Sequence, residues 1–352
     1  MAASITEQTS VPLVVGADIL QAVDDKVKAV DAGEEPARYI LPLLADSGLL
    51  EADLLTTARA IREISRHDLS AGFTVWAHKM TQTYLANAGT AAADNVEKQL
   101  RAGQRPGITG MAAAFKEFAG CGKIELTATP VDGGYSVNGK LNWASNLYDD
   151  AVLVTAVHTD EGERLLIFIE GGTEGLTFGK PFGLLGLNST ESAWVSLENV
   201  YVPETQVLTH DFDSFILQVR PTFVVLQIAE CLGVAEAAIG AASERLFGVN
   251  ATFTADVDAV AAHIADIVAR QEAITARVGN SDINPVELLE LRLEAAEVAV
   301  AAANLEVRVA GGAGYAKSSP ASRRFREAAF IPVQSPSEAQ LRWELEKAKA
   351  QA

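Results

Sequence analysis

The hydrophobic pattern of this 352-residue chain changes twice along its length, and the order of the three patterns limits the folds open to it. Up to about residue 105, apolar residues recur at helical spacing, as in ADLLTTARAIREISRHD (52–68). From 106 to 208, β-branched residues alternate with polar ones between turn signals. From 209 to 352, helical spacing returns. We therefore predict an α+β, mostly α chain, with an N-terminal helical domain (1–105), a middle β domain (106–208) and a C-terminal helical bundle (209–352).

The middle region contains three strand patterns with clear boundaries. The stretch 123–146 reads as a strand, an Asp-Gly-Gly turn and a second strand, with a further turn at Asn138–Gly139. The stretch 150–172 predicts a hairpin closed by an acidic loop, and 190–203 predicts a strand that ends at Pro203. These patterns are typical of a small antiparallel sheet.

A long helix is predicted from Pro285, because Asn284 is a capping residue and Pro285 suits the first helical position. Its alanine-rich, apolar sequence continues to Gly311 and Gly312, which we interpret as stop signals. A helix that is apolar nearly all round is usually buried between neighbours, often at a subunit interface.

Composition excludes several classes of function. The chain has 46 acidic and 28 basic residues and a formal charge of −18, which argues against nucleic-acid binding. Residues 1–18 lack the basic and apolar parts of a signal peptide, and no run of about 20 apolar residues predicts a membrane span. The two cysteines, Cys121 and Cys231, support neither a disulfide framework nor a metal site. We expect an acidic cytoplasmic protein.

Four stretches, in this order, resemble motifs of the acyl-CoA dehydrogenase superfamily of flavoproteins. They are GYSVNGKLNWASNLYDDAVLVTAV (134–157), GLLGLNSTESAWVSLENVYVPETQVL (183–208), AECLGVAEAAIGAASERL (229–246) and VRVAGGAGYAKSSPASRRFREA (307–328). The similarity extends from about residue 35 to 345. It implies N-terminal helices, a middle β-barrel or sandwich and a C-terminal four-helix bundle that forms a homo-dimer or tetramer. It also implies FAD, or FMN, as cofactor and an acyl-CoA or another small molecule as substrate.

The resemblance assigns roles around the flavin ring. Trp143 would pack along one face of the ring, and the Ser145 hydroxyl would donate a hydrogen bond to its polar edge. Other family positions expected near the cofactor are Thr109, Asn146, Arg308, Gly311 and Gly312. Of these, Arg308 is a candidate phosphate donor, and the two glycines would let a backbone approach the dinucleotide of a neighbouring subunit.

Two family motifs are altered in this chain. The Glu-Pro-x-Ala-Gly-Ser stretch that follows the position of Thr109 is replaced by GMAAAFKEFAGCGKIEL (110–126). The Arg-x-x-Phe-Gly clamp for the flavin diphosphate corresponds only loosely to Arg245 and Phe247–Gly248.

The largest departure concerns the catalytic base. Most of the family removes a proton with a glutamate just before the last helix, and that position falls on Ser335. The alternative position on an inner helix falls near Phe223. We interpret Ser335–Glu338 as a capping box, with Ser335 as the cap, Pro336 as the first helical residue and Glu338 bonding back to the cap.

Two other titratable residues are candidates for catalysis. Glu230 lies in the apolar run FVVLQIAECLGVAEAAIG, where it is either a pocket acid with a shifted pKa or a structural group paired to a cation. His78 lies where the family often has a residue that faces the pocket, although a lone histidine is more often a packing residue.

Three functions remain open. The first is a flavin-dependent dehydrogenase with a displaced base. The second is a two-component monooxygenase on the same fold, which uses reduced flavin from a separate reductase and needs no carboxylate base. The third is a partner subunit of a heteromeric dehydrogenase, in which another chain supplies the glutamate.

Overall fold

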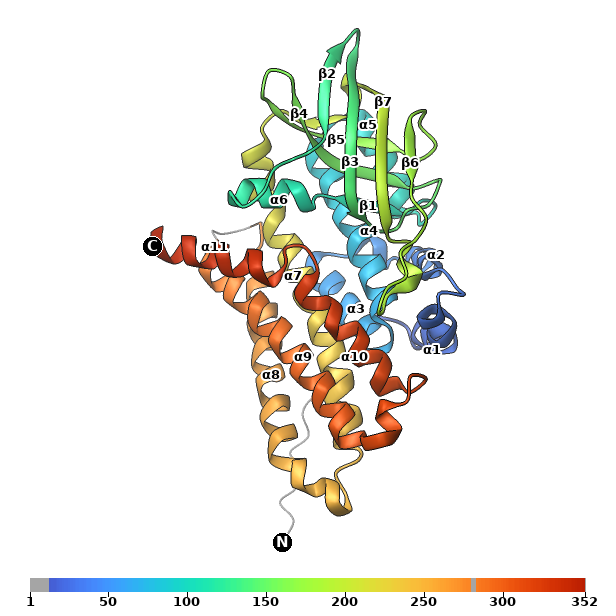
Figure 1. Ribbon diagram of the computed structural model, residues 1–352, viewed down its shortest axis with the longest axis vertical. Helices are drawn as coiled ribbons and strands as arrows, with labels where there is room; N and C mark the ends of the chain where they lie inside the picture. Colours follow the sequence, from blue (N-terminus) through green and yellow to red (C-terminus); the bar gives the residue numbers. More distant parts are fainter. Residues whose placement is uncertain (1–12, 280–282, 352) are drawn as a thin grey trace.

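The computed structural model describes residues 13–279 and 283–351, so most of the first 18 residues, which entered the signal-peptide interpretation, lie outside the described ranges. Helices form both ends of the chain, and the residues between them in sequence form a mixed sheet, which lies at one end of the molecule (Figure 1). The helices are α1 (Ala17–Ala32), α2 (Ile40–Asp46), α3 (Leu54–His67), α4 (Leu69–Ala88), α5 (Ala91–Arg101), α6 (Ala112–Ala119), α7 (Phe212–Ser243), α8 (Thr254–Thr275), α9 (Pro285–Tyr315), α10 (Pro320–Phe330) and α11 (Glu338–Gln351). The strands are β1 (Gly107–Gly110), β2 (Thr127–Val131), β3 (Gly134–Ala144), β4 (Val152–Thr159), β5 (Arg164–Glu170), β6 (Leu176–Phe178), β7 (Ala193–Pro203) and β8 (Val207–Thr209).

The predicted fold class is confirmed, with N-terminal helices, a central sheet and a C-terminal helical bundle. The strand order is β6-β7-β3-β2-β4-β5-β8, and β1 pairs in parallel with β4. The predicted hairpins β2–β3 and β4–β5 are antiparallel pairs in the structure. The prediction of a turn at Asn138–Gly139 is wrong, because both residues lie inside β3. There the register with β7 shifts between Val137 and Gly139, so the Asn-Gly signal marks an irregularity in a continuous strand.

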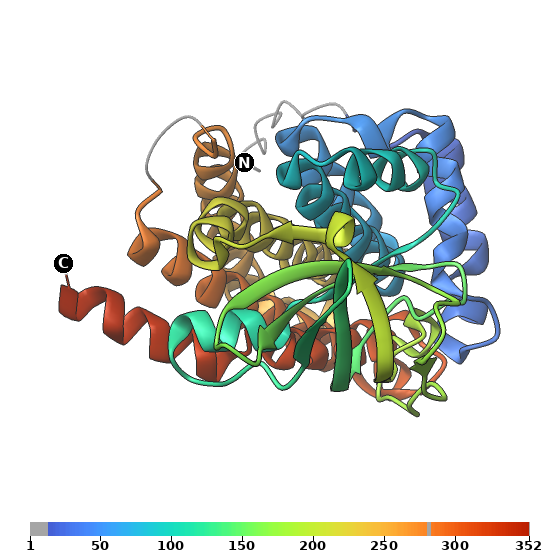
Figure 2. The same ribbon diagram turned by 90° about the horizontal axis from the view of Figure 1, so that it is seen from above.

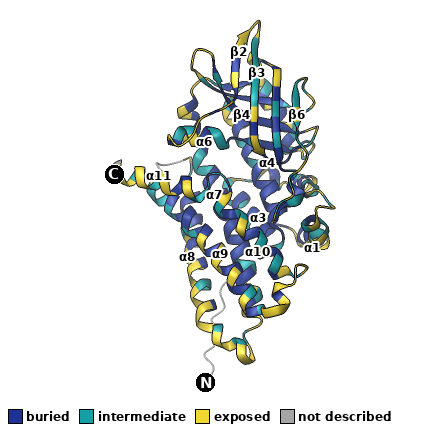
Figure 3. Ribbon diagram, viewed as in Figure 1, coloured by how far each residue is buried: buried dark blue, intermediate teal, exposed yellow. Residues whose placement is uncertain are grey.

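The core of the bundle is α7, which packs against α3, α4, α8 and α9 (Figure 3). By length and composition α7 could cross a membrane, but 83% of its most apolar 18-residue window is buried inside the protein. Its hydrophobicity therefore fits a helix enclosed by other helices. Hydrophobic burial against four neighbours is the main stabilising contribution to this part of the fold.

The start of α9 and the break near its end both agree with the sequence. Asn284 accepts a hydrogen bond from the backbone N–H of Val286, and Pro285 is the first helical residue. The helix is interrupted at Gly311, whose φ is 60° and ψ is −144°, and a second helical stretch continues from this kink to Tyr315. Because glycine has no Cβ, it adopts this conformation without the strain another residue would have. Regular helical geometry therefore ends at Gly311, as the interpretation of the glycines as stop signals expects, and a short helical stretch follows it.

A set of hydrogen bonds joins α4 to β1, at the boundary between the N-terminal helices and the sheet. His78 of α4 is fully buried; its Nδ1 accepts from the Gly107 N–H at 3.1 Å, and its Nε2–H donates to the Leu100 carbonyl at 3.0 Å. These two partners define the neutral tautomer, and burial lowers the pKa of His78 to about 3. Both ring nitrogens of His78 are thus bonded to the backbone, which favours a packing role for this residue.

We predict that His78→Ala lowers the free energy of unfolding by about 2–4 kcal/mol, because it leaves the Gly107 N–H and the Leu100 carbonyl buried without partners. The matched control is His67→Ala, which removes a histidine whose Nδ1 contacts Asp24 at the surface. That change is expected to alter stability by less than about 1 kcal/mol. Urea unfolding measures both values, and equal effects of the two changes would contradict the structural role of His78.

Candidate functional site

Trp143 lies near the end of β3 and is 52% exposed. Its ring packs against Phe182, with ring centroids 4.7 Å apart and planes tilted by 38°. A large apolar ring left half open at a strand end presents a flat surface on which another planar group can stack. The loop that follows Phe182 contacts α10, because the Leu185 carbonyl accepts from Arg326 at 3.3 Å. The exposed aromatic surface therefore borders the helix that leads to Ser335.

The Ser145 hydroxyl, just after β3, begins a row of buried hydroxyl groups. Ser145 Oγ lies 2.7 Å from Ser192 Oγ, which lies 2.8 Å from Thr190 Oγ1. Thr190 in turn donates to the Leu187 carbonyl at 2.8 Å. Each hydroxyl has one proton, so all three bonds form only if Ser192 donates to Thr190 and Ser145 donates to Ser192. In this arrangement Ser145 offers lone pairs to a ligand, so it is an acceptor and not the donor that the family resemblance implies.

Asn146 does not face the surface of Trp143. It is fully buried, and its side-chain N–H₂ donates to the carbonyls of Thr74 and Gly107 at 3.2 and 3.1 Å. Asn146 thereby ties α4 and β1 to the end of β3. Thr109, in β1, places its hydroxyl 3.1 Å from the hydroxyl of Tyr84 on α4. Thr109 and Asn146 therefore both connect α4 to the sheet, whereas Ser145 bonds to Ser192.

Arg308 and the two glycines lie elsewhere. Arg308 stacks over the ring of Phe253, with its guanidinium carbon 5.2 Å from the ring centroid. It and Gly311 belong to the last turns of α9, at the end of the bundle away from the sheet (Figure 1). A Cβ added at Gly311 or Gly312 would meet no atom within 4 Å, so the backbone there is open to approach. Within one chain these residues are not brought together with Trp143.

A short helix occupies the place of the altered family motif after Thr109. This helix, α6, lies beside α11 at one edge of the molecule (Figure 2). Trp343 and Lys347 of α11 both donate to the Ala119 carbonyl, at 3.4 and 2.9 Å. The C-terminal carbonyl of α6 is thus satisfied by the last helix of the chain.

Ser335 is anchored to α7 by its backbone. The side chain of Gln227 donates to the Ser335 carbonyl at 2.9 Å, while the Ser335 hydroxyl is buried and has no hydrogen-bond partner. The predicted capping box is wrong. Helix α11 begins at Glu338, the hydroxyl that accepts from the Gln340 N–H at 3.4 Å belongs to Ser337, and Glu338 bonds to Arg342. The cap lies two residues later because Ser335 is held against α7.

Glu230 lies on the face of α7 toward this segment and is 1% exposed. Its Oε2 accepts from the side chain of Gln334 at 2.7 Å, and its Oε1 is buried without a partner. Burial raises the pKa of Glu230 to about 8, against the opposing effects of the Gln334 bond and the nearby positive charge of Arg292. The carboxyl group is therefore poised to titrate near neutral pH.

Arg292 was not anticipated from the sequence. It is 1% exposed and reaches from α9 to Gln227 Oε1, Gln334 Oε1 and the Ile331 carbonyl, each at 3.4 Å. Its helical spacing with Leu288, Leu291 and Ala295 places it on the buried face of α9, and this was the available signal. Its partners, which lie about 40 and 65 residues away in sequence, could not be read from that spacing.

Aromatic side chains fill the space between α4, α6, α7 and α10. Ring centroids of successive pairs lie 4.4–5.3 Å apart, and the five residues of this aromatic cluster are Phe73, Trp76, Phe115, Phe223 and Phe330. The Phe223 position, where part of the family has its base, is therefore occupied by a packed ring.

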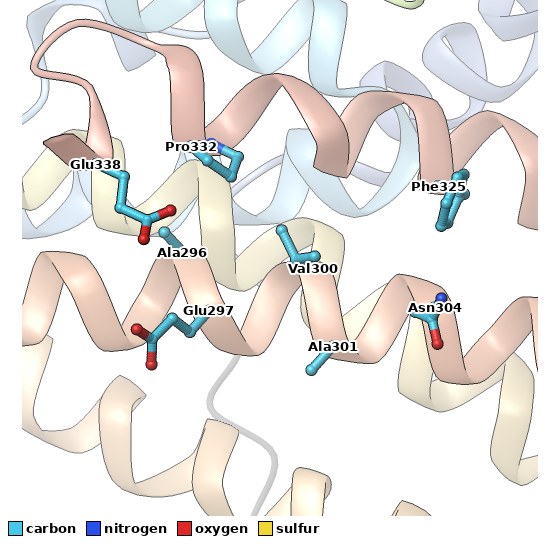
Figure 4. A pocket seen from close by; sticks show the side chains of 8 residues that line it. All are labelled: Ala296, Glu297, Val300, Ala301, Asn304, Phe325, Pro332 and Glu338. Atoms are coloured by element: carbon cyan, nitrogen blue, oxygen red, sulfur yellow. The ribbon is translucent and has the colours of Figure 1, made fainter.

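Two hollows are open on the described surface. One, of about 500 Å³, lies between α9 and the α10–α11 segment; Figure 4 shows Phe325, Val300 and Glu338 along it. The other, of about 560 Å³, lies between α6, α7, the start of α9 and α11, and includes Arg220, Glu344 and Lys347. Neither is lined by Trp143, Glu230 or Ser335.

Comparison with known proteins agrees with the fold. The chain is 27% identical to benzylmalonyl-CoA dehydrogenase of Aromatoleum aromaticum over 291 residues, which cover 78% of this chain and 76% of that protein. The structure matches butyryl-CoA dehydrogenase of Megasphaera elsdenii with a TM-score of 0.83, at 20% identity over 95% of this chain and 97% of the other. It also matches dibenzothiophene monooxygenase of Paenibacillus sp. A11-2 with a TM-score of 0.78, at 18% identity over 92% and 93%. No family model matches the chain.

We predict that Glu230→Gln flattens the pH dependence of stability between about pH 4.5 and 8. The pKa of Glu230 is raised from 4.5 to about 8 on folding, so the folded state binds this proton more tightly than the unfolded state does. The free energy of unfolding of the unchanged protein therefore falls as pH rises through that window. Urea unfolding at about pH 5, 6.5 and 8 measures the effect.

Asp68, whose pKa burial raises to about 7, contributes in the same window, so the decisive quantity is the difference between the two proteins. As pH rises, the free energy of unfolding of Glu230→Gln should increase relative to that of the unchanged protein. Parallel curves for the two proteins would show that Glu230 does not titrate in this range.

Proposed function

We propose that this chain, which belongs to the acyl-CoA dehydrogenase superfamily, is a flavin-dependent oxidoreductase acting on an acyl thioester or a related small organic substrate. The observation that carries the proposal is the half-exposed Trp143 packed on Phe182, beside the buried hydroxyl row and next to α10. A dehydrogenase is favoured because a curated relative that matches 78% of the chain is named a CoA dehydrogenase.

The residues at the end of β3 fit the ring of a flavin. Trp143 supplies an open apolar face, and Ser145 supplies an acceptor whose proton is already used inward. Arg308 and the open backbone at Gly311 suit a phosphate group, but they lie at the other end of the bundle. One chain therefore does not hold both ends of one FAD with these residues. We expect a homo-dimer or tetramer in which two copies share the cofactor.

When bound, FAD supplies the two-electron acceptor for oxidation of the substrate. The other requirement is removal of a proton next to the thioester carbonyl, for which a carboxylate is well suited. Ser335 cannot fill that role, and Phe223 is packed among aromatic rings. The carboxyl group of Glu230 is connected to this segment, because it accepts a hydrogen bond from Gln334, the residue before Ser335. We therefore expect proton removal to be slower than in relatives that have a carboxylate at position 335.

A second candidate is a two-component flavin monooxygenase, which would receive reduced flavin from a separate reductase. The absence of a carboxylate at Ser335 favours it, because oxygen activated on the flavin, and not a base, carries out such reactions. The structural match to a monooxygenase of the same fold is consistent with this candidate. Substrate-dependent oxygen uptake with an added flavin reductase would identify the protein as a monooxygenase.

Purification without flavin and without FAD affinity would favour a partner subunit of a heteromeric dehydrogenase.

We predict that the purified protein binds FAD and that Trp143→Leu weakens binding at least about fivefold, because it removes roughly 1 kcal/mol of ring stacking. Trp343→Leu is the matched control, since Trp343 is exposed to a similar degree, 47% against 52%, but lies on α11. FAD titration followed by flavin absorbance measures both constants. Equal loss in the two variants would rule out Trp143 as the ring-stacking residue.

We further predict that an acyl-CoA bleaches the bound flavin slowly under anaerobic conditions, and that Ser335→Glu accelerates bleaching by at least about tenfold. The substitution places a carboxylate at the family position of the base, and each tenfold in rate corresponds to about 1.4 kcal/mol of barrier. Ser337→Glu, two residues away at the cap of α11, is the control and should not accelerate bleaching. If no thioester bleaches either protein, dehydrogenase chemistry is excluded.

A further inference from the structure

Five polar side chains lie buried between α7, α9 and the segment that joins α10 to α11. This polar cluster consists of Gln227, Glu230, Arg292, Gln334 and Ser335. Cys231 borders it; Arg292 Nη1 lies 3.5 Å from its sulfur, and burial raises the pKa of its thiol to about 11. Buried polar groups are expensive unless they are bonded, so a cluster of this size needs a structural or functional reason.

The hydrogen bonds orient both amide side chains. Gln334 donates to Glu230 at 2.7 Å and accepts from Arg292 at 3.4 Å, so its amide cannot turn over without losing both partners. Gln227 accepts from Arg292 at 3.4 Å and donates to the Ser335 carbonyl at 2.9 Å. Arg292 also donates to the Ile331 carbonyl. Residues 331–335 are therefore tied to α7 and α9 at three points.

Two atoms of the cluster remain free. Glu230 Oε1 and Ser335 Oγ are buried and have no partner, and a group of this kind costs about 1–3 kcal/mol when it stays unbonded. Every contact of Arg292 is 3.4–3.5 Å long, and none is made to a carboxylate. The shortest bond in the cluster is the one between Gln334 and Glu230. The segment is therefore held most tightly by the carboxyl group of α7.

We propose that Glu230 is a positioning residue, which acts through Gln334 to hold residues 331–335 in place and to keep the Ser335 hydroxyl free for a hydrogen bond to the bound substrate or flavin. This role rests on the proposed flavin site, because that site gives the free hydroxyl its ligand. Glu230 itself touches no ligand in this scheme. It affects the reaction only by fixing the position of residues 331–335.

The charge of Glu230 decides how firmly the segment is held. Arg292 from α9 and the amides of Gln227 and Gln334 are the groups that face the carboxyl, with the Cys231 thiol beside them on α7. When Glu230 loses its proton, a buried anion with one unbonded oxygen must be solvated. Water reaches it most directly by loosening the segment that covers it. The segment should therefore open as pH rises through about 8.

Hydrogen–deuterium exchange tests this role without requiring flavin. In the unchanged protein, exchange of the 331–337 amides, corrected for the intrinsic rise with pH, should increase at least about fivefold from pH 7 to 9. Glu230→Gln keeps the size and an acceptor oxygen but cannot ionise, so exchange in that segment should stay flat. Glu230→Ala removes the acceptor and should raise exchange at both pH values.

Glu236→Gln is the matched control, because Glu236 lies on α7, has a pKa raised by burial, and contacts Arg62 and Arg66 instead of the polar cluster. It should behave like the unchanged protein. If Glu230→Gln keeps the rise in exchange, or if Glu230→Ala leaves the segment unchanged, the positioning role is wrong.

The rate of flavin reduction in the FAD-bound protein is the second measurement. The rate at which substrate reduces the flavin should fall above about pH 8 in the unchanged protein, and Glu230→Gln should remove that fall. An identical alkaline limb in both proteins would overturn the role of Glu230 in the site. A protein that shows the exchange pattern but binds no flavin would refute the proposed function and leave the positioning of the segment standing.

Discussion

The hydrogen bonds between α4 and β1 are the interaction on which the candidate site depends. His78 satisfies one backbone donor and one backbone acceptor, and Asn146 satisfies two carbonyls, one of them that of Gly107. These groups lie at the boundary where helical hydrogen bonding ends and sheet hydrogen bonding begins. Without side-chain partners, the boundary would leave several buried backbone groups unpaired. The end of β3, with Trp143 and Ser145, keeps its place against the helices because this joint is satisfied.

The candidate site has an exposed part on the sheet and a buried part between the helices. On the sheet side, an aromatic surface is exposed and a hydroxyl row ends in an acceptor. On the helical side, the segment at Ser335 covers a polar cluster, and the aromatic cluster fills the space around Phe223. The sheet side therefore retains what a planar cofactor needs. On the helical side, the carboxyl group of Glu230 is buried beneath this segment.

Local signals in the sequence predicted much of the fold because their physical causes are local. Asn284 and Pro285 start α9 through a cap and a fixed φ, and the alternating residues of β4 and β5 form the expected hairpin. Two predictions were wrong because contacts between residues distant in sequence determined the local structure. Asn138–Gly139 became an irregularity inside β3 because β7 pairs on both sides of it, and the cap of α11 fell on Ser337 because Gln227 holds Ser335.

The site was less predictable for the same reason. The spacing of α9 marks Arg292 as buried, but its partners come from α7 and from the segment before α11. Resemblance to a family named Trp143, Ser145 and Thr109 as cofactor residues, and these assignments remain predictions until a flavin is titrated. The direction of the hydroxyl row could not be foreseen, because it depends on which proton each neighbour has already used.

That row has a consequence beyond its own packing. The Leu187 carbonyl can only accept, so it sets the polarity of every link from Thr190 back to Ser145. This carbonyl is three hydrogen bonds away from Ser145. It nevertheless determines that a ligand at Ser145 must donate a hydrogen bond and not accept one. A hydrogen-bond donor in place of the Leu187 carbonyl would reverse the direction of all three bonds. Ser145 would then donate to a ligand, although Ser145 itself had not changed. The hydrogen-bonding character of Ser145 is thus set by the backbone at Leu187, through two intervening hydroxyl groups.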